Sequence, residues 1–543
     1  MAERCLLQWL FGRRRRGGGL AADEDVELAA LAQAVTPAED EPSAATPAEA
    51  PAPMMVVPDL MTARLGSTPD AVAFNIDGGD GLTFADWDRR STSLAHGLLA
   101  RGASTGARVA LLFSGMDWSG YAVAYLGILK AGATAVHLNP GLEPAEVHRR
   151  LKQCAVVGII ASDGLPMPAE FTGWVSDVAD LDTGITDPVR VTVSPEGISD
   201  IHYTSGTTGT PKAYQVPHGN LTFGRTPGWF KQFGGAEHML VPMVLGTGTS
   251  ATVVNIALSS PATVVLVDPH ATERMGELIS SLRVGSVMIT PAIALDIVEH
   301  RLNERHDLTS VHTWACGSSP LAPATADALL AMVPGSKVST VCSQSEAGPA
   351  LIVNVYDPGR PLSVGKPSPI TELRLVGSDG QDVATGEVGE IWLRSPAPKR
   401  TYLDQPEVTA RLLADGWHRT GDLGRQDDEG YLYLFDRKVD AITVDGTLVS
   451  SVEVEAAAYS YDGVREAAAV AVAEPVGGQQ VLLVVRLEAP ADVAGLRQHL
   501  EPLLTAAQQP VDIVADGLLP RTQNGKVLKR VLRERFQTEP ATD

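Results

Sequence analysis

The segment Tyr203–Lys212, with the sequence YTSGTTGTPK, contains the kinds of residue needed to hold a polyphosphate. Gly206 and Gly209 permit positive φ angles and a close approach of the backbone to a ligand. Successive backbone N–H groups in such a loop form a concave anion-binding surface. Lys212 adds a full positive charge, and the hydroxyl groups come from Thr204, Ser205, Thr207 and Thr208. The segment is not a Walker A loop, because Pro211 stands where that pattern has glycine before the lysine.

Two segments further along the chain carry groups that suit a nucleotide. Trp417–Asp422 reads WHRTGD, and the carboxylate of Asp422 can accept hydrogen bonds from two vicinal ribose hydroxyls. Asp436-Arg437 follows after a short interval. The planar and permanently charged guanidinium of Arg437 suits contacts to ribose or phosphate.

A carboxylate and an ammonium complete the set of charged candidates. The segment Ser343-Gln-Ser-Glu346 contains an acid of the kind that binds Mg²⁺ together with phosphate oxygens. Near the C-terminus, Leu519–Lys526 reads LPRTQNGK. Its Asn-Gly pair predicts a tight turn that projects Lys526 outward.

In this order the segments resemble the motifs of the adenylate-forming superfamily. That group includes acyl-CoA synthetases, the adenylation domains of nonribosomal peptide synthetases and beetle luciferases. The resemblance is strongest at YTSGTTGTPK and the following Pro217–Asn220, and it extends from about residue 58 to 535.

The resemblance implies a role for each candidate. The segment 204–212 would hold the phosphates of ATP, with Lys212 also catalytic, and the loop Gly317-Ser318-Ser-Pro320 would flank the adenine. Glu346 would bind Mg²⁺ and Ser345 would lie near the α-phosphate. Asp422 would bind the ribose, and Arg437 the ribose or the phosphates. Lys526 would stabilise the charge that develops as a carboxylate attacks the α-phosphorus.

The implied reaction joins a small-molecule carboxylic acid to AMP and releases pyrophosphate. A rotation of the C-terminal domain about a hinge at Arg437 would then admit a thiol. This thiol would belong to CoA or to the phosphopantetheine of an acyl carrier protein. Three alternatives stay open: transfer to an amine, activation of an oxyanion such as nitrite, and a nucleotide-binding scaffold without catalysis.

The chain departs from the family pattern at three places. Val439 replaces a polar residue at the hinge, Cys342 replaces an aromatic residue that often stacks on adenine, and Val244-Leu245 replaces an aromatic-histidine pair. The predicted substrate pocket consists of Val244, Leu245, Gly246, Cys316 and Cys342, beside Gly317. It lacks the aspartate that holds an α-ammonium, so we expect an aryl or a short-to-medium acyl acid rather than an α-amino acid.

Alternating strands and helices must position these segments, and they predict an α/β fold with parallel sheet. The expected strands are 108–113, 135–138, 156–161, 264–267 and 287–289, and the expected helices are 91–100, 120–130 and 273–282. After about residue 350, short strands at 373–376, 390–394 and 431–435 predict a small β-rich subdomain. A compact α+β region follows, with helices at 452–458 and 493–504 and strands at 467–473 and 480–487.

We therefore expect a tail over 1–55, a large AMP-binding domain over 56–436, and a small C-terminal domain over 437–540 that carries the catalytic lysine. The tail is Arg-, Gly-, Ala- and Pro-rich, which predicts disorder. Two other interpretations of the tail are a translation start at Met54 or Met55 and a docking peptide.

Composition excludes several classes of protein. The net charge of −22 argues against a nonspecific binder of nucleic acid or of anionic membranes. The four cysteines lie at 5, 154, 316 and 342, without the spacing of a zinc site or a disulfide framework. With no apolar stretch long enough to span a membrane, the sequence predicts a cytoplasmic protein.

Overall fold

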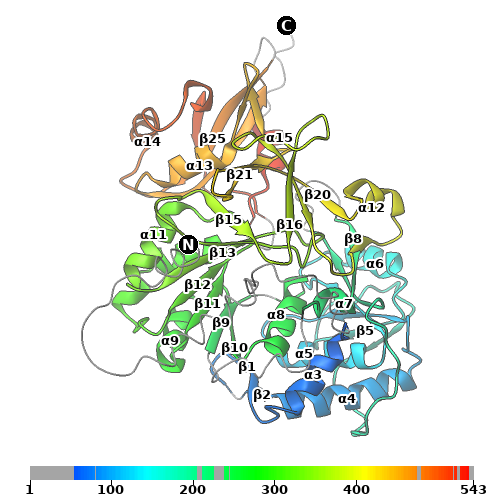
Figure 1. Cartoon of the computed structure of the whole chain (residues 1–543). Coiled ribbons are helices and arrows are strands. Elements are labelled where there is room, and N and C mark those ends of the chain that lie inside the picture. The colour runs from blue at the N-terminus through cyan, green and yellow to red at the C-terminus, as the bar shows by residue number, and fades with distance from the viewer. Residues whose placement is uncertain are drawn as a thin grey trace, which may run out of the picture.

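The computed structural model describes residues 54–79, 81–204, 211–224, 238–243, 245–246, 248–473, 478–517, 519–521 and 526–536. We use the name large domain for residues 54–436 and small domain for residues 437–536. Figure 1 shows the small domain, in orange and red, above the large domain. The tail expected over 1–55 lies almost entirely outside the described residues.

One sheet of the large domain has seven strands in the order β18-β8-β7-β4-β3-β5-β6. The strands from β7 to β6 run parallel, while β8 and β18 are antiparallel additions at one edge. Their bounds are β3 (Arg108–Leu112), β4 (Thr134–Leu138), β5 (Gly158–Ala161), β6 (Trp174–Ser176), β7 (Ile198–Tyr203), β8 (Ala213–Pro217) and β18 (Thr401–Tyr402).

The second sheet has fourteen strands, in the order β16-β17-β20-β21-β15-β14-β13-β12-β11-β9-β10-β1-β2 with β19 on β20. The first part of the chain supplies β1 (Val72–Ile76), β2 (Leu82–Thr83), β9 (His238–Pro242), β10 (Thr263–Val267), β11 (Ser286–Ile289), β12 (Thr313–Cys316) and β13 (Lys337–Cys342). The later part supplies β14 (Ile352–Val355), β15 (Ser363–Pro367), β16 (Glu372–Val376), β17 (Gly389–Arg394), β19 (Leu413–Ala414), β20 (Trp417–Gln426) and β21 (Leu432–Arg437).

Helices cover both faces of the parallel strands. The central layer between the sheets contains α3 (Val57–Leu65), α4 (Phe84–Ala100), α5 (Trp118–Lys130) and α8 (Gly248–Ser259). The outer faces carry α6 (Pro144–Gln153) on the first sheet, and α9 (Thr272–Leu282), α10 (Pro291–Glu299) and α11 (Pro323–Met332) on the second. Successive strand residues alternate between these cores, as the pleat requires: Val136 packs in the outer core and Ala135 in the central one.

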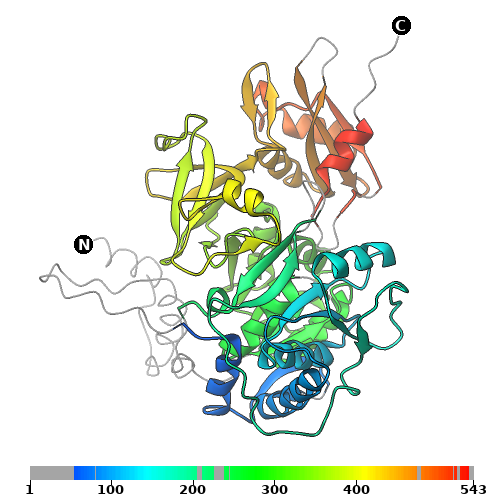
Figure 2. The same cartoon turned by 90° about the vertical axis from the view of Figure 1, so that its right-hand side faces the viewer.

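The small domain follows β21. Its three-stranded sheet consists of β24 (Val464–Ala473), β25 (Gln479–Leu487) and β26 (Asp512–Ala515), beside a hairpin of β22 (Ile442–Val444) and β23 (Thr447–Val449). Its helices are α13 (Ser451–Tyr459), α14 (Val493–Leu500) and α15 (Lys529–Phe536). Figure 2 shows it as a body beside the β-rich part of the large domain. The short helices α7 (His218–Leu221) and α12 (Pro406–Leu412) belong to the large domain.

The expected α/β class and the expected elements are confirmed, with one correction to a helix end. The helix expected over 493–504 ends at Leu500, and Pro502, which cannot donate a helical hydrogen bond, lies just beyond it. The β-rich region expected after residue 350 is present, and its strands join the second sheet because β14 pairs with β13.

Candidate active site

The predicted motifs converge because they follow the carboxyl ends of parallel strands. Thr204 follows β7 of the first sheet, while the 243–246 segment, Gly317 and the 343–346 segment follow β9, β12 and β13 of the second. The carboxyl edge of parallel strands is the usual place for a ligand in α/β folds. Segments far apart in sequence are thereby gathered at one edge.

Gly246 brings the two sheets together at this edge. Its φ of +95° favours glycine. A Cβ at this position would lie 2.7 Å from the Cα of Asn139 and 2.8 Å from the carbonyl oxygen of Leu138, at the end of β4. The segment that contains Leu245 and Gly246 therefore packs directly on the other sheet.

The ends of the phosphate segment are fixed by the hairpin of β7 and β8. The backbone N–H of Thr204 donates to the carbonyl oxygen of Lys212 at 3.0 Å, and the N–H of Lys212 donates to Oγ1 of Thr204 at 3.1 Å. Ser205, Gly206, Thr207, Thr208 and Gly209 lie outside the described residues, as does Val244. The described part thus places both ends of the segment at the edge of the sheet.

Asp422 lies at the centre of a hydrogen-bonded group. It stands opposite Arg437 in the pairing of β20 with β21, and Nε of Arg437 donates to its Oδ1 at 3.0 Å. Nε2 of Gln344 donates to Oδ2 of Asp422 at 2.8 Å and to the carbonyl oxygen of Thr420 at 2.6 Å. His418 contacts Oε1 of Gln344 through Nε2 at 3.1 Å. The carboxylate is therefore held in one orientation at the edge of the site.

Glu346 is held by a second group. The hydroxyl of Tyr402 donates to its Oε1 at 2.8 Å. Arg400 donates to the carbonyl oxygen of Ser345 and, at 2.8 Å, to Oδ1 of Asn220. Burial lowers the pKa of Arg400. Glu346 lines a small cavity together with other polar side chains, namely Tyr214, Arg400, Tyr402 and His418.

Lys526 reaches this group from the small domain. Its ammonium lies within electrostatic range of Arg437, Asp422, Glu346 and Cys342. Burial lowers the pKa of Lys526, as does the nearby charge of Arg437, while Asp422 and Glu346 act in the opposite direction. The structure therefore brings an ammonium from the small domain to the carboxylates of the large domain.

The predicted pocket residues lie on the same edge. Leu245 and Cys316 are buried, and Gly317 and Ser318 follow Cys316. Ser318 has a φ of +83°. Burial and, to a smaller extent, Asp422 raise the pKa of Cys342 to about 12, while Lys526 acts in the opposite direction. The Cys342 thiol is therefore a small apolar group beside the charged residues.

Sequence reasoning missed four residues that orient these carboxylates: Gln344, His418, Arg400 and Tyr402. Gln344 lies within the motif 343–346 and His418 within the motif 417–422. Their side chains can form hydrogen bonds, which is the only sequence signal for a role in orienting the carboxylates. Arg400 and Tyr402 carried no local signal, because their partners lie at least 55 positions away.

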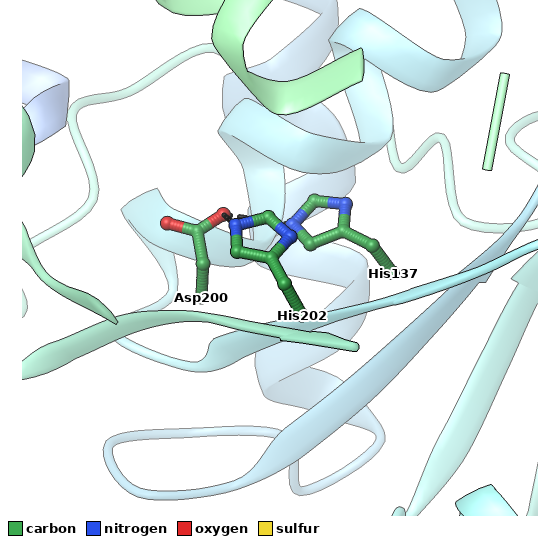
Figure 3. Close-up of side chains that lie close together, drawn as sticks. All are labelled: His137, Asp200 and His202. Carbon is green, nitrogen blue, oxygen red and sulfur yellow. Dashed lines mark hydrogen bonds and ion pairs between the residues drawn. The ribbon is translucent and has the colours of Figure 1, made fainter. Parts of the chain in front are cut away.

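A fully buried polar group lies between the first sheet and the central helices (Figure 3). Nε2 of His137 lies 2.7 Å from Oδ1 of Asp200, and Nε2 of His202 lies 3.9 Å from the same oxygen. Burial opposes the charge of Asp200, but the hydrogen bond and charge of His137 lower its pKa to about 2. The hydroxyl of Tyr121 forms a hydrogen bond with Nδ1 of His137, and the hydroxyl of Tyr125 donates to Oδ2 of Asp200.

The geometry of the rings does not suit a metal that both histidines would bind. The rings of His137 and His202 stack with centroids 4.4 Å apart and planes 17° apart. A metal must lie in the plane of each imidazole that binds it, at about 2.0–2.1 Å from the nitrogen for zinc. Planes so nearly parallel do not meet within that distance of both rings. The hydrogen bond between His137 and Asp200 instead ties β4 to β7, the strand that leads to Thr204.

Two family models match this chain. The AMP-binding enzyme model matches residues 61–403, and the model of the AMP-binding enzyme C-terminal domain matches residues 453–526. The chain belongs to the AMP-binding enzyme family. It is therefore an adenylate-forming enzyme with the two-part architecture of that superfamily.

Three relatives show the range of similar proteins. Feruloyl-CoA synthase from Amycolatopsis sp is 32% identical over 496 residues, which cover 87% of this chain and 97% of the relative. The fatty acid–acyl-carrier-protein ligase ScoC from Streptomyces coeruleorubidus is 28% identical, with 85% and 93% covered. The solved structure of the amide bond synthetase McbA from Marinactinospora thermotolerans has a TM-score of 0.76 at 26% identity, with 89% of this chain and 100% of McbA covered.

Within the described residues, no helix combines the length and the apolar character needed to cross a bilayer.

Proposed function

We propose that this enzyme activates an apolar carboxylic acid with ATP and Mg²⁺ and transfers the acyl group to the thiol of CoA. The observation that carries the proposal is that the hydrogen-bonded pair of Asp422 and Arg437 lies, together with Glu346, within electrostatic range of the Lys526 ammonium. Lys526 comes from the C-terminal part of the small domain, whereas Asp422 lies on β20 and Glu346 in the loop after β13 of the large domain. Arg437 is the last residue of β21, where the two domains join. Such a group can neutralise and orient a nucleotide and an attacking acid at the same time.

An aryl acid of the hydroxycinnamate class is the proposed substrate. The described pocket residues Leu245, Gly246, Cys316 and Cys342 carry no charged side chain, so they favour an apolar acyl group over an α-amino acid. The similarity to a feruloyl-CoA synthase supports the aromatic choice. Such a pocket would distinguish homologous acids by their shape alone, and an apolar pocket discriminates modestly between acids that differ by one methylene group.

In the first half-reaction, a carboxylate oxygen of the acid bonds to the α-phosphorus of ATP, and the bond to the leaving pyrophosphate breaks. Both reactants are anionic, so charge neutralisation and positioning dominate the catalysis. Lys526 offsets the charge that develops on the α-phosphate oxygens. Asp422, held by Gln344 and Arg437, accepts hydrogen bonds from the ribose hydroxyls.

Glu346 is the proposed ligand of Mg²⁺. Its carboxylate is partly exposed at the edge of the sheet, and Tyr402 holds Oε1. A carboxylate combined with phosphate oxygens is the set of ligands that Mg²⁺ prefers. When bound, the ion would neutralise phosphate charge.

In the second half-reaction, the thiol loses its proton to solvent as its sulfur bonds to the acyl carbonyl carbon. The bond from that carbon to the phosphate oxygen breaks, and AMP leaves with the bonding electrons. We propose that the small domain rotates about Arg437 between the half-reactions, so that Lys526 withdraws. The nucleotide contacts of the large domain then serve both steps, whereas the lysine serves the first.

The test is pyrophosphate release with ATP and Mg²⁺ against a panel of acids. The panel contains ferulic, 4-coumaric, benzoic and octanoic acids, phenylalanine and nitrite. We expect release with an aryl acid, and an acyl-CoA product when CoA is present. No release with any acid would contradict the proposal. Product with a holo-carrier protein or an amine but not with CoA would contradict the assigned acceptor.

A further inference from the structure

A β-bulge in the small domain lies beside the segment that carries Lys526. In the pairing of β24 with β25, Val464 faces Leu487 and Glu466 faces Arg486, so Arg465 is one extra residue on β24. Bulges re-aim side chains and are frequent next to active sites. The register of this strand therefore changes at one defined point.

The extra residue moves Glu466 to the other face of the sheet. Val464 and Ala467 pack in one core of the small domain, whereas Ala468 packs in the other with Leu519. In a regular strand, Val464 and Glu466 would share a face. Because of the bulge, Glu466 instead shares the face of Ala468, where the lysine segment begins.

Glu466 binds the base of the lysine segment directly. Its Oε2 accepts from the backbone N–H of Leu519 at 3.3 Å and forms an ion pair with Nη2 of Arg521 at 3.2 Å. Its side chain is only 10% exposed. The residues before and after the turn of this segment, 519–521 and 526–528, also pair with each other. The backbone N–H of Leu528 donates to the carbonyl oxygen of Pro520 at 2.7 Å, and Arg521 forms an antiparallel β-bridge with Val527. The carboxylate thus anchors the residues before the turn, and their pairing with those after it holds Lys526.

The bulged residue itself contacts the large domain. Nη1 of Arg465 forms an ion pair with Oε1 of Glu299 at 3.0 Å, at the last residue of α10. Asp296 of the same helix lies in the electrostatic field of Arg486 and Arg521, the two arginines that pair with Glu466. Acidic groups of α10 thus face basic groups of the small domain across the contact.

We propose that the bulge at Arg465-Glu466 positions Lys526 for the first half-reaction. Arg465 docks the small domain on α10, and Glu466 fixes the segment that presents the lysine. Both are positioning residues, because they act through Lys526 and contact neither reactant. The inference rests on the proposed function, in which the lysine serves adenylate formation and leaves before the thiol attacks.

The decisive experiment separates the half-reactions in the full-length enzyme. Adenylate formation is followed by ATP–pyrophosphate exchange with ferulic acid, or with the acid of the panel that reacts fastest. Thioester formation is followed from the corresponding synthetic acyl-adenylate and CoA. In Glu466→Gln we expect exchange to fall by about 10- to 100-fold, because a misplacement of about 1 Å can cost as much as about 100-fold. Thioester formation should keep its wild-type rate.

The matched control is Glu534→Gln, which removes the same charge from an exposed pair with Arg530 on α15. It should change neither half-reaction. An equal loss of both half-reactions in Glu466→Gln, or no loss of exchange, would overturn the inference. Wild-type enzyme without exchange for any acid would instead refute the proposed function.

A charge exchange tests the docking contact independently. Arg465→Glu and Glu299→Arg should each lower exchange, because each places like charges together. The double variant restores opposite charges at the contact between the domains, while the lost ion pair of Arg465 with Glu488 is common to the Arg465→Glu variant and the double variant. The double variant should therefore recover part of the loss relative to Arg465→Glu, and thioester formation should stay unchanged throughout. Failure of the double variant to recover, with melting temperatures equal to wild type, would contradict the role of Arg465.

Discussion

The two domains supply the candidate site in different ways. In the large domain, Asp422 is held by Gln344, and Glu346 is held by Tyr402, through hydrogen bonds within one folded body. In the small domain, Lys526 stands on a segment whose base is anchored at Glu466. The first arrangement is suited to stay in place through both half-reactions, and the second is suited to be brought in and withdrawn. Changes in the two regions should therefore have different kinetic signatures.

The largest expected effect is on adenylate formation in Lys526→Ala. We expect ATP–pyrophosphate exchange to fall by about 10²–10³-fold, the cost of removing one donor that stabilises developing charge. Thioester formation from a supplied acyl-adenylate should stay at the wild-type rate. Lys526→Arg retains the charge and should recover part of the exchange. If the alanine variant loses both half-reactions equally, the proposed division between the domains is wrong.

Disruption of the large-domain core should give the opposite signature. Asp200→Asn leaves His137 without its charged partner in a fully buried place, and removal of one partner of a buried pair costs about 3–5 kcal/mol. We expect a marked fall in melting temperature by calorimetry. The remaining activity should fall equally in both half-reactions as the enzyme unfolds. An unchanged melting temperature would show that the hydrogen-bonded pair of His137 and Asp200 does not stabilise the fold.

Asp422→Asn tests the contact that should serve both steps. The change weakens the ion pair with Arg437 and the proposed bonds to the ribose. Hydrogen bonds to charged groups contribute about 1.5–3 kcal/mol, or about 10- to 100-fold in rate or affinity. We expect kcat/KM for ATP and the rate of thioester formation both to fall. A loss confined to the first half-reaction would place Asp422 with the lysine rather than with the nucleotide.

The pH dependence should identify Lys526 without a loss of fold. The ammonium is charged below its pKa, and burial and Arg437 hold this pKa below the ordinary lysine value. Therefore kcat/KM for ATP, which reports the free enzyme, should fall as pH rises through that lowered pKa. In Lys526→Arg the alkaline fall should be absent, because a guanidinium stays charged. An identical alkaline limb in both enzymes would assign it to another group.

Much of the fold could be predicted from the sequence because its signals are local. The expected strand over 264–267 and helix over 273–282 match β10 and α9 within one residue, since runs of buried residues and helical spacing are properties of neighbours. The continuation of β13 into the β-rich region could not be predicted in this way. It depends on the antiparallel pairing of Cys342 with Ile352, which is a contact between strands rather than a pattern within one.

The same distinction applies to the site. The roles of Lys212, Glu346, Asp422, Arg437 and Lys526 follow from motifs and stay predictions, while their meeting at one edge required the fold. The residues that hold the carboxylates had no motif, because Gln344 and Asp422 lie 78 positions apart. In the sequence, His137 is a single histidine in an apolar strand. Its pairing with Asp200 could not be predicted, because it depends on the contact between β4 and β7.

Gln344→Met should give the smallest effect and the finest test of the comparison. The substitution keeps the length of the side chain but removes the donor to Asp422 and the contact to His418. Gln344 does not touch ATP in this proposal and acts only through the orientation of Asp422, so we expect an effect no larger than that of one ordinary hydrogen bond. That contribution is about 0.5–1.5 kcal/mol, and KM for ATP should therefore rise by about twofold to tenfold. Because Gln344 acts on the large-domain group, the binding of AMP in the second half-reaction should weaken by the same factor. A rise in KM for ATP with unchanged affinity for AMP would mean that Gln344 acts on the phosphates or on Lys526, and the large-domain group would then not be a single unit.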